Sequence, residues 1–144
     1  MEKIQIRSNV KEYQITDEND NELGVIRIDT TDFGFYNRTE EAGKRIHEIL
    51  KRFEAMCKED ITTEQRFEKL AEYDKEVKAE LNKMFDYDVS SVVFGNKNCL
   101  SFGNGELFIK RFLDAVIPVI KKDVEKEQKI TKQKMAKYTK RYIK

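Results

Sequence analysis

The first thirty residues show the two-residue alternation of apolar and polar positions that is typical of β-strands. The apolar residues that alternate with polar neighbours are Ile4, Ile6, Tyr13 and Ile15. A further apolar run, Leu23–Ile28, follows an Asp/Asn-rich segment at residues 17–21. Because strand-like runs flank a turn-forming cluster, the pattern predicts a β-hairpin, with an earlier strand around Ile4 and Ile6.

Two amphipathic helices are predicted next. The first follows the cap-rich segment Asp29–Asp32 and runs to about Cys57. Its apolar stripe consists of Ala42, Ile46, Ile49, Leu50, Phe53 and Met56. The second follows a capping box formed by Thr62 and Gln65. Its apolar stripe consists of Phe67, Leu70, Val77, Leu81, Met84 and Phe85. Both stripes have the spacing of one buried helix face.

Residues 88–105 interrupt the helical spacing. The segment Asp88–Phe94 fits either a single helical turn or a short strand. Residues 95–105 are rich in glycine and asparagine, which tolerate positive φ, so they predict an ordered loop. We expect the side chains of Phe94 and Phe102 to anchor this loop.

A third long helix is predicted to start near Asn104–Glu106, and its first part is the most apolar segment of the chain. Its apolar residues are Leu107, Phe108, Phe112, Leu113, Val116, Ile117, Val119 and Ile120. Pro118 lacks an amide hydrogen and is expected to kink or divide this helix. Beyond it the sequence stays compatible with a helix and becomes basic.

These elements together predict an α+β fold: an N-terminal β-hairpin or small antiparallel sheet packed with three or four helices, and a long basic C-terminal helix. A chain of 144 residues is the usual size of one domain. We expect residues 1–120 to form a compact α+β body. Residues 121–144 would be a basic helical extension of the same domain.

The charge of the chain is unevenly distributed. Charged residues make up 38% of the chain, against about 25% in an average domain, so exposed, charge-rich helices are expected. Residues 121–144 contain nine lysines and one arginine against three acids, a net charge of +7. Since the whole chain carries +1, residues 1–120 carry −6. An acidic body with a basic end is therefore predicted.

Membrane insertion and export are not expected. No apolar run approaches the roughly 20 residues of a membrane span, and the N-terminus lacks a signal-peptide pattern. Cys57 and Cys99 are far apart and form no paired motif. We therefore expect the protein to be located in a reducing cytosol.

The residue types that usually carry catalysis or metal binding lack the required neighbours. His47 has no potential ligand three or four positions away. The turn at Asp17 resembles the start of a calcium loop, but its sixth position is Glu22 instead of glycine. Ser101 lacks the first glycine of a hydrolase elbow, and Cys99 reads as an ordinary loop cysteine. The sequence predicts no catalytic residue, no metal site and no cofactor.

The candidate partner-binding residues lie in the loop, in the apolar helix and at the basic end. They are Phe94, Gly95, Phe102, Phe108, Phe112, Lys134, Lys137, Tyr138, Lys140, Arg141 and Tyr142. The basic end interleaves lysine and arginine with aromatic residues, which leaves three interpretations. It binds nucleic acid by charge and stacking, it docks on the acidic body, or it is an adaptable helix for a protein partner.

The order of these parts resembles the small tail assembly chaperones encoded in tail gene clusters of long-tailed phages and prophages of Gram-positive bacteria. The parts that carry the resemblance are the β segment ending in Ile28–Asp32, a helix with Arg38, Ala42 and Ile46, a charged helix, Val93-Phe94-Gly95 with its Gly/Asn loop, the apolar helix Phe112–Ile120, and Lys137-Tyr138-Thr139. The likeness covers most of the chain.

The resemblance implies a non-enzymatic role in the bacterial host cytosol. Such chaperones coat the tape measure protein, help to recruit tail-tube proteins and then leave the structure, and many phages also make a longer frameshifted form. The interpretation as a tail assembly chaperone also allows a homo-oligomer. The alternative function is a small phage or host regulatory protein whose basic C-terminal helix binds nucleic acid or a host protein, including bacterial immunity proteins.

Overall fold

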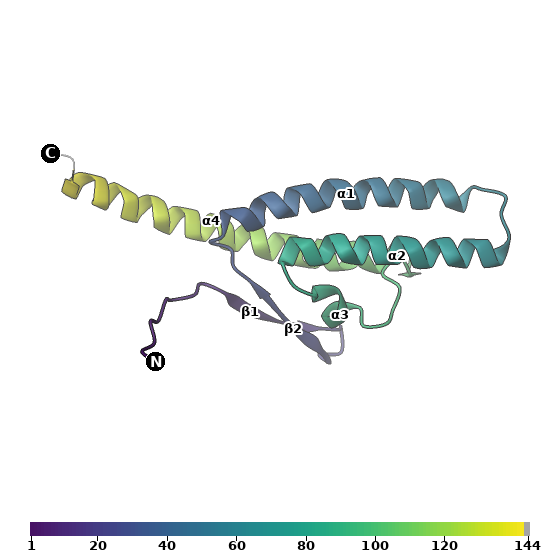
Figure 1. Ribbon diagram of the computed structural model, residues 1–144, viewed down its shortest axis with the longest axis horizontal. Coiled ribbons are helices and arrows are strands. Elements are labelled where there is room, and N and C mark those ends of the chain that lie inside the picture. The colour runs from purple at the N-terminus through teal and green to yellow at the C-terminus, as the bar shows by residue number, and fades with distance from the viewer. Residues whose placement is uncertain (143–144) are drawn as a thin grey trace.

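The computed structural model describes residues 1–142, except for the side chains of Tyr138, Lys140, Arg141 and Tyr142. Within these residues the fold is α+β, as predicted: an antiparallel hairpin and four helices, the last of them very long (Figure 1). The elements are β1 (Lys11–Thr16), β2 (Glu22–Ile28), α1 (Phe33–Cys57), α2 (Thr63–Phe85), α3 (Val89–Val93), β3 (Phe102–Gly103), β4 (Glu106–Leu107) and α4 (Phe108–Tyr142).

The N-terminal hairpin pairs β1 with β2, and Tyr13 lies opposite Ile26. The side chains of Ile26 and Ile28 are buried in the core, so the predicted alternation is confirmed for residues 11–28. The expected strand around Ile4 and Ile6 is wrong for the single chain. These two side chains are 90% and 86% exposed, because no strand within residues 1–142 pairs with them.

Helices α1 and α2 form an antiparallel pair, seen side by side in Figure 1. Their predicted starts are confirmed. The Asp32 side chain accepts a hydrogen bond from the backbone N–H of Gly34, and Thr62 forms its capping box with Gln65. The buried apolar residues of the two helices, among them Ala42, Ile46, Val77 and Leu81, face each other in the core.

The segment after α2 folds differently from the expectation in two places. Residues 89–93 form a helical turn, which decides between the two alternatives for that segment. The expected helix start near Asn104–Glu106 is wrong, because Asn104 and Gly105 have φ angles of 53° and 78° and turn the chain between β3 and β4. Helix α4 begins only at Phe108.

Helix α4 passes through Pro118 without interruption, so the expected division at this residue is wrong. Proline removes one helical hydrogen bond, but Val116 and Ile120 on either side of it are buried in the core. Packing of these neighbours holds the helical path. None of the helices in residues 1–142 combines the length and the apolar character needed to cross a bilayer.

Candidate functional site

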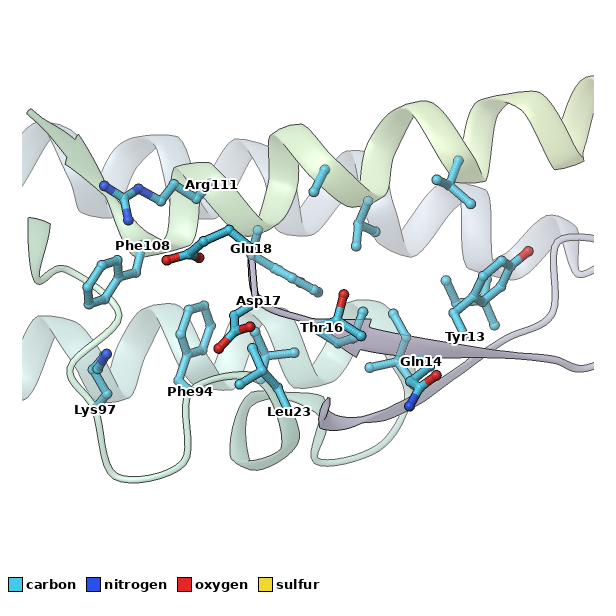
Figure 2. A pocket seen from close by; sticks show the side chains of 18 residues that line it. Tyr13, Gln14, Thr16, Asp17, Glu18, Leu23, Phe94, Lys97, Phe108 and Arg111 are labelled. Carbon is cyan, nitrogen blue, oxygen red and sulfur yellow. The ribbon is translucent and has the colours of Figure 1, made fainter. Parts of the chain in front are cut away.

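An open groove of about 620 Å³ lies between the hairpin and α4; we call it the hairpin–helix groove (Figure 2). The consecutive residues Tyr13–Glu18 line one side, together with inward-facing side chains of β2. Phe112, Val116 and Val119 of α4 line the other side. The groove therefore has a strand edge as one wall and a helix as the other, with a mostly apolar interior.

Aromatic rings build the inner end of the groove. The Phe94 and Phe112 rings pack edge to face with centroids 6.0 Å apart, and Phe85 lies 6.1 Å from Phe112. Phe94 and Phe112 are 8% and 6% exposed, so both belong to the core as well as to the groove wall. These rings make the inner end rigid, because each is held by at least one other aromatic side chain.

Two cations lie against the ring of Phe108, at the same end of the groove as Phe94 (Figure 2). The Lys97 Nζ lies 4.5 Å and the Arg111 guanidinium carbon 5.3 Å from the ring centroid. Arg111 also donates a hydrogen bond to the backbone carbonyl of Gly103. The loop after α3 and the start of α4 therefore make this end of the groove positively charged and aromatic.

The hairpin turn supplies negative charge on the other side of the groove. Asp17 Oδ1 accepts hydrogen bonds from the backbone N–H groups of Asn19 and Asn21, at 2.9 Å and 3.0 Å. The bond from Asn21 contributes most to holding the pKa of Asp17 below its usual value. Asp17 and Glu18 both line the groove, so its two sides carry opposite charges. This bonding also confirms that the Asp17 segment is a hairpin turn.

A polar anchor joins the hairpin to α4 at the far end of the groove. The Tyr13 hydroxyl donates a hydrogen bond to Asp123, and the Lys11 Nζ lies 3.7 Å from an Asp123 carboxylate oxygen. Burial, followed by this hydrogen bond, raises the pKa of Tyr13 to about 12. The anchor sets the spacing between β1 and α4 at this end.

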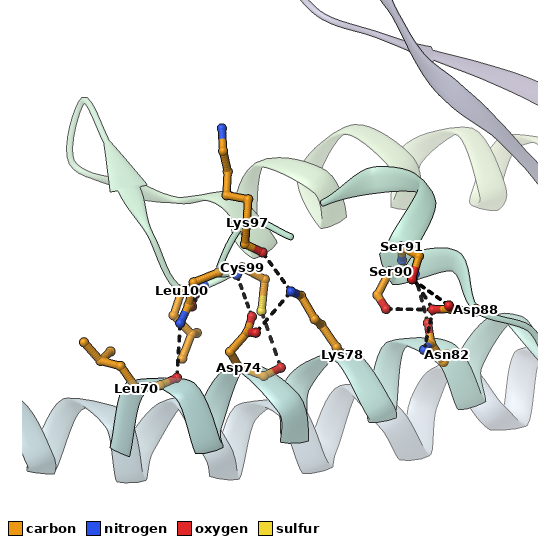
Figure 3. A network of polar contacts seen from close by, with 11 residues as sticks. Leu70, Asp74, Lys78, Asn82, Asp88, Ser90, Ser91, Lys97, Cys99 and Leu100 are labelled. Carbon is orange, nitrogen blue, oxygen red and sulfur yellow. Dashed lines mark hydrogen bonds and ion pairs between the residues drawn. The ribbon is translucent and has the colours of Figure 1, made fainter. Parts of the chain in front are cut away.

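Figure 3 shows how the loop after α3 is tied to α2. Asp74 accepts a hydrogen bond from the backbone N–H of Cys99 at 2.7 Å and pairs with Lys78 at 3.1 Å. Lys78 also donates to the carbonyl of Lys97 at 2.8 Å. Burial, with a further contribution from Asp74, raises the pKa of the Cys99 thiol far above its ordinary value. This cysteine is therefore a poor nucleophile.

The structure brings together three of the predicted partner-binding residues, namely Phe94, Phe108 and Phe112. Gly95 adjoins them and takes a φ of 57°, which turns the chain out of α3. Phe102 lies elsewhere. It is 71% exposed and borders a separate apolar hollow of about 520 Å³, so the expectation that it anchors the loop is wrong.

The predicted residues of the basic end are on the part of α4 beyond the body. Lys134 and Lys137 are exposed, and so is every side chain from 128 to 137, so this stretch does not dock on the acidic body. The predictions for the side chains of Tyr138, Lys140, Arg141 and Tyr142 lie outside the described residues.

Sequence reasoning missed the β1 edge, Lys97 and Arg111 as parts of the groove. One local signal was present for Arg111, which follows Phe108 by three residues and so shares its helix face. Nothing local pointed to Lys97 or to the strand edge, because these meet α4 only through the tertiary fold.

The remaining candidates for chemistry stay apart. His47 is exposed on α1. Among residues 1–142, no group of three or more histidine, cysteine or acidic side chains could hold a metal ion. No protein-family model matches this sequence, and no curated protein and no solved structure matches it. The groove and the exposed end of α4 are the features of the described residues that could bind a partner.

Proposed function

We propose that this protein is a non-enzymatic phage tail assembly chaperone that binds the tape measure protein and tail-tube subunits during tail morphogenesis. The observation that carries the proposal is the open apolar groove, about 620 Å³ in volume, beside a helix that continues beyond the body. The groove does not identify the partner. The tape measure protein is proposed as the partner because the order of elements resembles that of phage tail assembly chaperones.

The groove supplies chemistry suited to an amphipathic partner segment. Apolar side chains such as Val119, which is 41% exposed, are accessible in it. Acidic groups on one rim and basic groups on the other can orient the charged positions of such a segment. Apolar anchors give affinity in this mode of recognition, while the rim charges select the register.

The end of α4 extends this surface. Residues 128–137 contain four lysines and no acid, and the apolar side chains of Ile130 and Met135 are 39% and 57% exposed among them. A long partner helix could contact both the groove and this end. Many copies, each bound weakly, would coat such a partner through avidity.

Co-expression with a phage tape measure protein tests the proposal. The soluble fraction of the tape measure protein should rise with the wild-type chain and fall back with Val119→Glu. The matched control is Val25→Glu, since Val25 is also 41% exposed but lies outside the groove. Equal insolubility of the tape measure protein with and without this chain would refute the function.

A second candidate function is nucleic-acid binding by the end of α4. The four exposed lysines at residues 128–137 without an intervening acid favour it. Such binding should weaken steeply with salt and disappear when the chain is truncated after Glu127. Binding that is absent, or that does not change with salt, would rule it out.

A further inference from the structure

Residues 1–10, which we call the N-terminal arm, have the pattern of a strand but no strand partner. The apolar side chains of Ile4, Ile6 and Val10 occupy even positions and are 90%, 86% and 48% exposed. The odd positions between them are polar: Lys3, Gln5, Arg7 and Asn9. The arm's only hydrogen bond within the described residues is local, from the Val10 N–H to the Ser8 hydroxyl.

The arm is not simply an extension of β1. In β1 the half-buried side chains are at odd positions, including Tyr13 and Ile15. A straight continuation of this strand would point Ile4 and Ile6 to the opposite face, away from the core. Since a shift of one residue exchanges the two faces of a strand, the arm is a separate strand that needs an edge of its own.

The edge of β1 that lines the groove offers such a site. Within residues 1–142, β1 pairs only with β2, so the backbone groups along its other edge have no strand partner. An extended peptide added there would pair its main chain with β1 and send alternate side chains into the groove. Phe112, Val116 and Val119 of α4 would receive those side chains.

We infer that, when no partner segment is bound, the N-terminal arm of a second copy of this chain occupies the groove as a third strand beside β1. Ile4 and Ile6 lie between β1 and α4, and the exchange is reciprocal, which gives a two-fold symmetric dimer. An arm of eight paired residues spans roughly 26 Å and covers the roughly 20 Å of β1. In the antiparallel orientation, Lys3 lies beside Asp17 and Glu18, so the charges match.

The geometry favours the arm of another copy over the arm of the same chain. To fold back on its own β1, the chain would have to reverse at Ser8 and Asn9. Tight hairpin turns use positive φ, usually with glycine, but this stretch contains no glycine and neither residue has a positive φ. Figure 1 shows the arm leading away from the body.

The state of the full-length chain in solution, measured by light scattering and sedimentation, tests this inference independently of the proposed function. The wild type should be a dimer at about 100 μM, where interfaces of micromolar affinity are occupied. Ile4→Asp/Ile6→Asp should weaken self-association by more than about 1,000-fold, because two apolar anchors are lost from each arm, four in the dimer. Gln5→Asp/Asn9→Asp adds the same charge to the other face of the arm and should leave the dimer intact.

A groove variant completes the test. Val119→Glu should also give a monomer, and circular dichroism should show a native fold because Val119 is 41% exposed. Mixing it with Ile4→Asp/Ile6→Asp should restore a weak heterodimer, since one intact arm then meets one intact groove. The inference is overturned by a monomeric wild type, by a dimer that survives the isoleucine substitutions, or by a mixture that stays monomeric. A monomer with slow amide exchange at residues 3–7 would show that the arm binds its own chain.

Discussion

Replacing Phe112 with alanine should destabilise the protein strongly, because this side chain joins the groove to the core. Phe112 is 6% exposed, and its ring contacts those of Phe85 and Phe94 at 6.1 Å and 6.0 Å. Removing a buried phenylalanine costs about 3–5 kcal/mol through lost burial and the cavity left behind. Phe112→Leu retains most of the apolar volume and loses mainly the two ring pairs, at about 0.5–1.5 kcal/mol each.

The measurement is urea unfolding followed by far-ultraviolet circular dichroism, since the chain is largely helical and contains no tryptophan. In thermal unfolding followed by the same signal, Phe112→Ala should lower Tm by roughly 8–16 °C for a chain of this length. The matched control is Phe102→Ala, which removes a ring that is 71% exposed and should cost less than about 0.5 kcal/mol. Equal costs for the two alanine variants, or a cost below about 1 kcal/mol for Phe112→Ala, would refute the reasoning.

Three further predictions concern the hairpin and the helix caps. Gly24→Ala should destabilise by about 1–3 kcal/mol in thermal unfolding, because a Cβ there would lie 2.5 Å from Val92 Cγ1; an unchanged Tm would contradict that contact. The pKa of Tyr13 rises to about 12 on folding, so its stabilising contribution is complete below pH 10 and is lost between about pH 10 and 12. Tyr13→Phe should remove that part of the alkaline loss in urea titrations, and identical pH profiles would argue against the bond to Asp123. Thr62→Ala should cost about 1 kcal/mol in the same assay, since it breaks a capping box; no change would mean that the cap is redundant.

Local patterns were sufficient for the elements whose residues interact with near neighbours in the chain. The hairpin at residues 11–28 and the caps at Asp32 and Thr62 depend on side chains within a few positions, and the structure confirms them. The start of α4 was harder. Asn104 and Gly105 suit both a helix start and a tight turn, and pairing of β3 with β4 decides between the two.

Contacts between distant parts of the chain could not be read from spacing. Phe102 and Phe112 are both aromatic residues near the same loop, but only Phe112 meets other rings in the core. The groove exists because β1 lies beside α4, about a hundred positions later in the sequence. Pro118 likewise stays helical because its neighbours are buried, which its own chemistry would not indicate.

Because α4 is continuous through Pro118, the wall of the groove and the basic end are parts of one helix. The hydrogen bond between Tyr13 and Asp123 acts as a pivot near the edge of the body. The helix beyond Asp123 extends roughly 28 Å to Tyr142 at 1.5 Å per residue. A tilt of about 10° at the pivot would therefore displace the tip by about 5 Å. A small tilt of the part of α4 that lines the groove would therefore move the far end of the helix by a larger distance. A force on that far end would in turn tilt the groove wall.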